Sequence, residues 1–207
     1  MATSLNHQKF KLAAPGAGAI VYQAKDAYLR VMLSMRTANV GSGYGITGGG
    51  FIECNDIDAS PAGTIMLAVD EAFRECCEEN AGFEGVVDQD SFMIRAQSVN
   101  PLVSRSDDIN RVHVANMFAL RVNDSEWKQI AALPPGIDGK GLPEREEGMC
   151  EFFLRWDGVI DPRQPERYVS VVDSSGACIT AADFCHAHEF YVITTLAWMQ
   201  QNGRLLP

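Results

Sequence analysis

Runs of apolar residues separated by turn residues predict most of the strands of this chain. They occupy residues 18–24, 28–36, 91–99, 111–122 and 151–158. Within 111–122 the side chains alternate between two sets, as they do when a strand presents two different faces to its surroundings. The pattern therefore predicts a sheet built from segments that are spread over the first three quarters of the chain.

A helical repeat replaces this pattern in three segments. Over residues 61–80, apolar side chains recur on one stripe at about 100° per residue, and glutamates fall on the opposite side. The stripe consists of Ile65, Val69, Ala72 and Cys76. Residues 125–133 and 181–202 are the other two predicted helices, and the Pro- and Gly-rich residues 134–147 predict a loop. Helices interspersed among strands indicate an α/β fold with a mixed sheet flanked by helices.

The length and the hydrophobic content fit one folded domain. With 207 residues, of which 46% are hydrophobic, the chain can form a core without disulfides or a structural metal. Residues 1–16 are polar or small and predict a flexible lead-in, which leaves 17–207 as the domain. Residues 159–207 exceed what the predicted sheet needs. We expect them to form a C-terminal helical extension whose last helix packs on the domain or makes a homodimer contact.

Charge and cysteine usage exclude several classes of protein. A net charge of −10 would repel a long polyanion, so sequence-independent binding to long nucleic acid is not expected. A small phosphorylated ligand is compatible with this charge if a divalent cation reverses the local field. No segment reaches the roughly 18 apolar residues of a membrane span. The six cysteines form no CxxC pair, so we expect reduced thiols in a cytoplasmic protein.

Two segments carry the candidate chemistry. Residues 41–50 contain six glycines, which indicates a backbone that turns sharply or approaches a ligand closely. Further along, Glu75, Glu78 and Glu79 are spaced i, i+3 and i+4, so their carboxylates crowd one helix face and repel each other. Arg74 can pair with Glu78. Glu75 and Glu79 are then uncompensated, and Mg²⁺ or Mn²⁺ would relieve the repulsion. The alternative is an acidic helix face that is only solvated.

Together, these segments resemble the signature of the Nudix hydrolase family. That signature is a glycine, five residues, a glutamate, seven residues, and then Arg-Glu-apolar-any-Glu-Glu-any-Gly-apolar. Residues 74–79, Arg-Glu-Cys-Cys-Glu-Glu, match its core without a gap, and Gly50 stands at the first glycine. The opening segment also contains Glu53, and Asp56 stands where the family has its first glutamate.

The chain departs from the family pattern in three places. Asp56 is a shorter carboxylate than the family's glutamate. Seventeen residues separate it from Arg74 where the family has seven, so ten residues, roughly 57–66, are inserted. Ala81 occupies the place of the last glycine of the signature, and Gly82 follows one position later. The Arg-Glu-apolar-any-Glu-Glu core is unaffected by these departures.

The resemblance implies a Nudix-type α/β/α sandwich and a set of site residues. The metal ligands would be Glu75, Glu78 and Glu79, with Mg²⁺ or Mn²⁺ as the cofactor. Arg74 would orient these glutamates, and the backbone of Gly49 and Gly50 would approach the metal or a substrate phosphate.

A general base would come from the signature or from a later loop. Within the signature the candidates are Glu78 and Glu79. In the loop that precedes residue 150 they are Glu144, Glu146 and Glu147.

The implied reaction is hydrolysis of the pyrophosphate bond in a nucleoside diphosphate linked to another moiety, with ADP-ribose or a similar nucleoside-diphosphate sugar as the favoured substrate. Two alternatives stay open. The substrate could be a nucleoside triphosphate or a dinucleoside polyphosphate. The protein could also be a non-catalytic Nudix-like module that binds a nucleotide or a protein, although such modules typically lose the glutamate triplet that this chain retains.

Overall fold

The computed structural model describes residues 11–12, 16–25, 28–37, 42–51, 64–106 and 111–206. Its strands are β1 (Lys11–Leu12), β2 (Gly16–Lys25), β3 (Tyr28–Arg36), β4 (Gly43–Gly45), β5 (Gly48–Phe51), β6 (Ala96–Ser106), β7 (Arg111–Arg121), β8 (Cys150–Trp156), β9 (Val169–Asp173) and β10 (Cys178–Ile179). Its α-helices are α2 (Thr64–Glu79), α3 (Gln89–Arg95), α4 (Asp124–Ala131) and α5 (Ala187–Gln201). Short 3-10 helices lie at Phe83–Gly85, Pro165–Arg167 and Ala181–Asp183.

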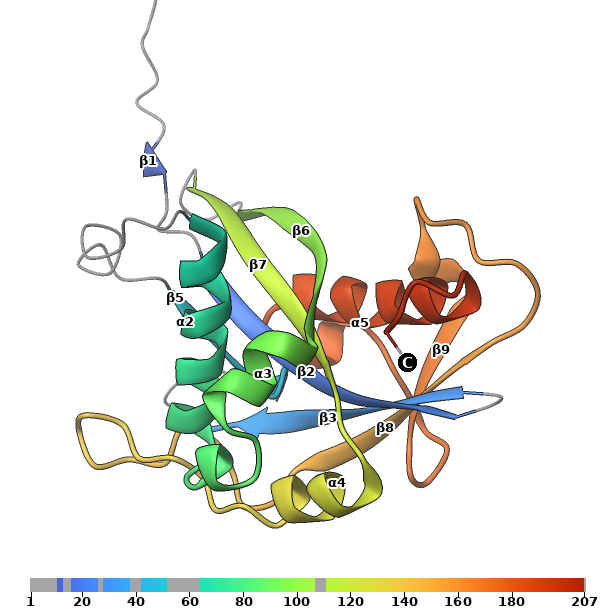
Figure 1. Ribbon diagram of the computed structural model, residues 1–207. Coiled ribbons are helices and arrows are strands. Elements are labelled where there is room, and N and C mark those ends of the chain that lie inside the picture. Colours follow the sequence, from blue (N-terminus) through green and yellow to red (C-terminus); the bar gives the residue numbers. More distant parts are fainter. Residues whose placement is uncertain are drawn as a thin grey trace, which may run out of the picture.

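Strand β2 lies at the centre of a mixed sheet. It runs parallel to β7 on one side, where Gly18 faces Met117 and Tyr22 faces Arg121. On the other side it runs antiparallel to β5 over its first half and to β3 over its second half. The order across the described strands is β1-β7-β2-β3-β8-β9-β10, with β4 on β3, β5 on β2 and β6 on β7 (Figure 1). The predicted mixed sheet is confirmed.

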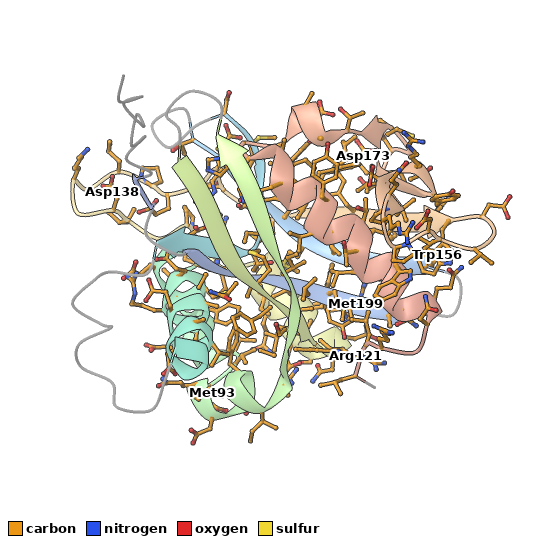
Figure 2. The ribbon with its side chains drawn as sticks, turned by 90° about the horizontal axis from the view of Figure 1, so that it is seen from above. Met93, Arg121, Asp138, Trp156, Asp173 and Met199 are labelled. Atoms are coloured by element: carbon orange, nitrogen blue, oxygen red, sulfur yellow. The ribbon has the colours of Figure 1, made fainter. Side chains whose placement is uncertain are left out.

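Helices cover both faces of this sheet. Along β2, Ile20 and Tyr22 point into a core shared with α5, whereas Ala19 and Val21 point into a core shared with α2. This alternation is the two-residue period of a strand. Figures 1 and 2 show α2 and α5 on opposite sides of the strands. The expected α/β/α sandwich is therefore confirmed.

Two predicted elements have other bounds in the structure. Residues 91–99 were expected to form one strand, but α3 occupies their first part and β6 begins only at Ala96. Asp88 caps α3 by accepting a hydrogen bond from the Ser91 N–H at 2.8 Å, and Phe92 is buried against Phe73. A local cap and one long-range aromatic contact thus outweigh the strand propensity of this segment.

The last helix begins at Ala187 rather than at residue 181. Thr180 and Asp183 cap each other reciprocally, which closes a single 3-10 turn before the helix starts. Residues 61–63, where the first helix was expected to begin, lie outside the described residues. Most of the predicted lead-in and of the insertion at 57–66 also lies outside them.

The C-terminal part of the chain contributes strands as well as a helix. β9 pairs antiparallel with β8, and β10 pairs with β9. α5 buries Val192, Ile193 and Leu196 against the sheet and forms the helical layer opposite α2. Among the described residues, no helix combines the length and the apolar character that a membrane span requires.

Arg145 anchors the loop between α4 and β8. Its side chain is fully buried and donates from Nε to Oδ1 of Asn80 at 2.9 Å. Its two Nη atoms donate to the carbonyl oxygens of Leu133, Glu146 and Gly148 at 2.8, 2.9 and 3.1 Å. A buried cation is tolerated only when its donors are satisfied in this way. The predicted loop at 134–147 is therefore fixed beside the C-terminal end of α2.

Replacing Arg145 with methionine should lower the free energy of unfolding by at least about 3 kcal/mol, because each buried acceptor that loses its donor costs roughly 1–3 kcal/mol. Arg145→Lys keeps the charge but loses the planar fork of donors, so it should recover only part of this stability. Urea denaturation of the two variants beside the wild type measures both effects. A methionine variant as stable as the wild type would show that Arg145 does not anchor the loop.

Candidate active site

The glycine-rich segment lies directly on α2. A Cβ atom on Gly48 would lie 2.7 Å from the backbone nitrogen of Cys76, and one on Gly50 would overlap the carboxyl group of Glu75. Both approaches are closer than real Cβ atoms allow, so a side chain at Gly48 would push β5 away from the α2 backbone and one at Gly50 would displace the Glu75 carboxyl group. The six-glycine run therefore brings the backbone of β5 against the acidic side of the helix.

The acidic side of α2 is largely buried. Glu71, Glu75 and Glu79 are 5%, 9% and 3% exposed, whereas 54% of the Glu78 side chain is exposed. The alternative of a merely solvated acidic face is wrong for three of these four glutamates. The apolar stripe on the other side is buried as predicted at Val69, Ala72 and Cys76.

Glu79 receives two donors on one of its oxygens. The Gly49 N–H donates to Oε1 at 3.1 Å, and Nη2 of Arg36 lies 2.6 Å from the same atom. The other oxygen, Oε2, is buried and has no hydrogen-bond partner among the residues that the structure describes. An unpaired carboxylate oxygen in a protein interior is costly and uncommon. Oε2 of Glu79 is therefore a carboxylate oxygen that could coordinate a cation.

Glu75 belongs to a network around Arg74. The Arg74 guanidinium hydrogen-bonds to Glu71, Glu75 and Glu78, and its Nη2 lies 2.6 Å from Oε1 of Glu75. The predicted pair with Glu78 is present. The expectation that Arg74 leaves Glu75 without compensation is wrong, because one guanidinium reaches carboxylates on both sides of it along the helix. Arg74 thus holds these like charges together.

Burial raises the pKa of both inward-facing glutamates. It raises the pKa of Glu75 to about 8, against the lowering effect of Arg74 and with a further increase from neighbouring carboxylates. Burial likewise raises the pKa of Glu79 to about 7, although Arg36 and the Gly49 N–H favour the charged form. Such shifts arise where carboxylates are desolvated with too little positive charge beside them.

These features fit a hard divalent cation. Glu75 and Glu79 offer carboxylate oxygens, which Mg²⁺ and Mn²⁺ prefer, and Oε2 of Glu79 has no competing partner. In the part of the chain that the structure describes, however, no three acidic, histidine or cysteine side chains converge as a ready-made metal cluster. Glu78 points to solvent and bonds to Arg74, so it does not meet Glu79 in this arrangement.

The remaining predicted site residues lie in a neighbouring loop or outside the described residues. Glu147 is exposed in the loop that Arg145 anchors, and it follows Glu146, whose N–H donates to the Met35 carbonyl at 2.8 Å. This loop borders the end of α2, because the Gly136 N–H donates to the Glu79 carbonyl at 2.9 Å. Glu53 and Asp56 lie outside the described residues. The hypothesis of a base from this loop stays a prediction.

Two residues beside the site were not singled out by the sequence patterns. Arg36, at the end of β3, pairs with Glu79, and Glu189, on α5, is 5% exposed and accepts from the Ile46 N–H at 3.2 Å. One signal could have revealed Glu189, since it is the sole Asp, Glu, Lys or Arg in the 15 residues of α5. Arg36 lies five positions before Gly41, where the glycine-rich segment begins, but nothing in its local pattern indicates a buried ion pair.

A separate cleft of about 600 Å³ lies at the far end of β2. Its lining includes Lys25, Arg95 and Arg121, which are engaged with Asp124, Glu126 and the Leu206 carbonyl, respectively. Figure 2 shows Arg121 beside the C-terminal segment. Lys25 is seven residues from Gly18, roughly 20 Å at the usual rise of a strand. The cleft is therefore distinct from the carboxylate cluster, and these three cations already have partners.

Gly50→Ala should displace the Glu75 carboxylate while leaving the fold intact, because the atom it meets is the end of a flexible side chain. Gly48→Ala is the matched comparison, since its Cβ meets the backbone of Cys76 and should destabilise the protein by about 1–3 kcal/mol. Thermal unfolding and Mn²⁺ titration of both variants separate these effects. Equal stability losses, or unchanged Mn²⁺ affinity in Gly50→Ala, would contradict this account of β5.

The metal-free protein should lose stability between about pH 5 and pH 8. The pKa values of Glu75 and Glu79 are raised above the ordinary value of 4.5, so the folded state binds more protons than the unfolded state in this window. The free energy of unfolding therefore falls as pH rises. Melting curves in EDTA should show this slope in the wild type and in the surface control Glu84→Gln, and a shallower slope in Glu79→Gln. An equal slope in Glu79→Gln would rule out a contribution from Glu79.

Comparison with known proteins agrees with this architecture. A MutT/Nudix family protein from Enterococcus faecalis aligns with a TM-score of 0.50 and 14% identity, over 91% of this chain and 62% of its own length. One from Listeria innocua aligns with a TM-score of 0.50 and 12% identity, over 95% and 99%. No protein-family model and no curated protein matches the sequence. At these identities the likeness concerns the fold: this chain has the MutT/Nudix fold, as the resemblance of its signature segment predicted.

Proposed function

We propose that this protein is a divalent-metal-dependent hydrolase of the Nudix type, which cleaves the pyrophosphate bond of a nucleoside diphosphate linked to another moiety. ADP-ribose or a similar nucleoside-diphosphate sugar is the favoured substrate. The observation that carries the proposal is the buried Glu79, held on one oxygen by Gly49 and Arg36 and unpartnered on the other. Its position on the signature helix of a MutT/Nudix fold supports this assignment.

The metal site would be formed by Glu75, Glu78 and Glu79. A bound Mg²⁺ or Mn²⁺ would supply polarisation of a phosphoryl oxygen and a lower pKa for bound water. Glu75 and Glu79 are buried beneath β5, and Glu78 is the exposed member that could join them by a rotation of its side chain away from Arg74.

The other residues of the site have positioning roles in this proposal. Arg74 holds Glu75 and Glu78 close to each other despite their like charge. Gly49 and Gly50 carry no side chain that would keep a phosphate away from the carboxylates. Because Glu78 is open to solvent, it is the candidate that best reaches the proton of an attacking water, with Glu79 and the loop residue Glu147 as the other candidates.

The proposed partner is a small nucleotide rather than a polymer. The net charge of −10 disfavours a long polyanion, and the described residues around Glu79 offer two buried cations, Arg36 and Arg145, and one partly exposed cation, Arg74. A nucleoside triphosphate or a dinucleoside polyphosphate would use the same metal chemistry, so the substrate is to be decided by assay.

Hydrolysis of a nucleotide panel should require Mg²⁺ or Mn²⁺, stop with EDTA and return when metal is added back. Glu79→Gln should reduce turnover by more than the roughly 10–100-fold that losing an outer-shell partner of a metal costs. Glu78→Gln should reduce it at least tenfold by the same reasoning. Phosphate released by an added phosphatase from the reaction products gives the rate for ADP-ribose, nucleoside-diphosphate sugars and dinucleoside polyphosphates, whose phosphates are capped until cleavage. For triphosphates, whose terminal phosphates the phosphatase itself removes, an added inorganic pyrophosphatase detects the released pyrophosphate instead.

Glu84→Gln provides the control, because it removes one exposed carboxylate just beyond α2. Circular dichroism should show native folding in all three variants. Metal-independent turnover by the wild type would remove the central premise. Metal binding without hydrolysis of any compound in the panel would favour the non-catalytic binding module instead.

A further inference from the structure

Glu189, on α5, interacts with both of the segments that place a hydrogen-bond donor on Oε1 of Glu79. Arg36 comes from the end of β3, and the Gly49 N–H comes from β5. The connection between β4 and β5 carries Ile46, whose N–H donates to Oε2 of Glu189 at 3.2 Å. Glu189 therefore contacts the short segment that sets the position of Gly49.

The segment just before α5 reinforces this contact. The Cys185 N–H donates to the Tyr44 carbonyl at 2.9 Å, and the rings of Tyr44 and Phe184 lie edge to face at 6.1 Å. Gly43 has a φ of 119° and no room for a Cβ, because the backbone of residues 183–185 fills that space. β4 is thus held between β3 and the start of α5, and the glycine-rich segment has a fixed path towards Glu79.

The Arg36 guanidinium pairs with Glu79 and interacts electrostatically with Glu189, and all three side chains are largely buried. The side chain of Arg36 is 10% exposed, and Glu79 and Glu189 are 3% and 5% exposed. Burial alone would lower the pKa of Arg36, but the charges of Glu79 and Glu189 outweigh it and raise that pKa. Arg36 therefore pairs with Glu79 on α2 and also lies in the electrostatic field of Glu189 on α5. A second buried cation, Arg145, interacts electrostatically with Glu79 but donates its hydrogen bonds to Asn80 and to backbone carbonyls, so Arg36 is the cation that contacts Glu79.

We propose that Glu189 is a positioning residue for Glu79, acting through Arg36 and Ile46. Glu189 attracts part of the positive charge of Arg36, so Arg36 pairs with Oε1 of Glu79 without fully neutralising that carboxylate. Glu189 also fixes the segment that presents the Gly49 N–H to the same oxygen. Oε2 of Glu79 then stays available to a divalent cation. This inference rests on the proposed function, because it takes Glu79 to be a metal ligand.

Removing the charge of Glu189 should weaken metal binding without removing the fold. In Glu189→Gln the amide oxygen can still accept from the Ile46 N–H. Arg36 then interacts more strongly with Glu79, because the second carboxylate has lost its charge, and the positive charge of Arg36 opposes binding of a cation to Glu79. We expect the Mn²⁺ dissociation constant to rise by about tenfold, the usual lower range for an outer-shell change. The measurement is calorimetric titration of the full chain with Mn²⁺ alone, together with a melting curve in EDTA. In the active enzyme, kcat should fall while the KM of the nucleotide changes little.

Two further variants separate charge from packing. Glu189→Asp keeps the charge, so its Mn²⁺ affinity should be closer to that of the wild type than the affinity of Glu189→Gln. Glu84→Gln controls for net charge and should bind Mn²⁺ like the wild type. If the wild type binds Mn²⁺ and Glu189→Gln binds it equally well, or if the Asp and Gln variants lose affinity equally, the role of Glu189 is refuted and the proposed function stands. If the wild type binds no Mn²⁺ and hydrolyses nothing, the proposed function itself fails.

Discussion

The contact that the site depends on is the one between Oε1 of Glu79 and its two donors, the Gly49 N–H and the Arg36 guanidinium. It joins α2 to two strands of the central sheet. The close approach needed for it is available only because β5 consists of glycines where it crosses the helix. The glycine-rich segment and the acidic helix are therefore two halves of one packing arrangement, and a change in either half moves the carboxylates of the other.

Electrostatics gives this arrangement its chemical character. Four carboxylates, those of Glu71, Glu75, Glu79 and Glu189, are buried around three guanidinium groups, those of Arg36, Arg74 and Arg145. Ordinary cores avoid such an excess of carboxylates, because desolvation of a charge is expensive unless it is paired. Retaining them near an unpartnered oxygen is understandable if a cation completes the site. Without a cation, this excess of buried carboxylates lowers the stability of the fold.

Much of the fold and part of the site could be predicted from local patterns. The apolar runs of β2, β3 and β8 and the alternation within residues 111–122 predict the strands of the sheet, and the spacing of Glu75, Glu78 and Glu79 predicts a shared helix face. Helix α3 is not predicted because its apolar side chains suit a strand equally well, and the cap at Asp88 together with the contact between Phe92 and Phe73 decides for the helix. Arg36 and Glu189 were missed because their roles come from tertiary contacts, such as that between Ile46 and Glu189, which are 143 residues apart in sequence.

Arg145 holds the surroundings of the site by hydrogen bonds that do not change with pH near neutrality. Its guanidinium donates to three backbone carbonyls and to the amide of Asn80, and Asn80 in turn donates to the carbonyls of Thr47 and Cys76. None of these acceptors gains or loses a proton near neutral pH. The hydrogen bonds between this loop, the helix end and the glycine-rich segment therefore keep their donors and acceptors over the range in which Glu75 and Glu79 change charge. Acidity can thus alter the charge of Glu75 and Glu79 while the hydrogen-bonded frame around them keeps its shape.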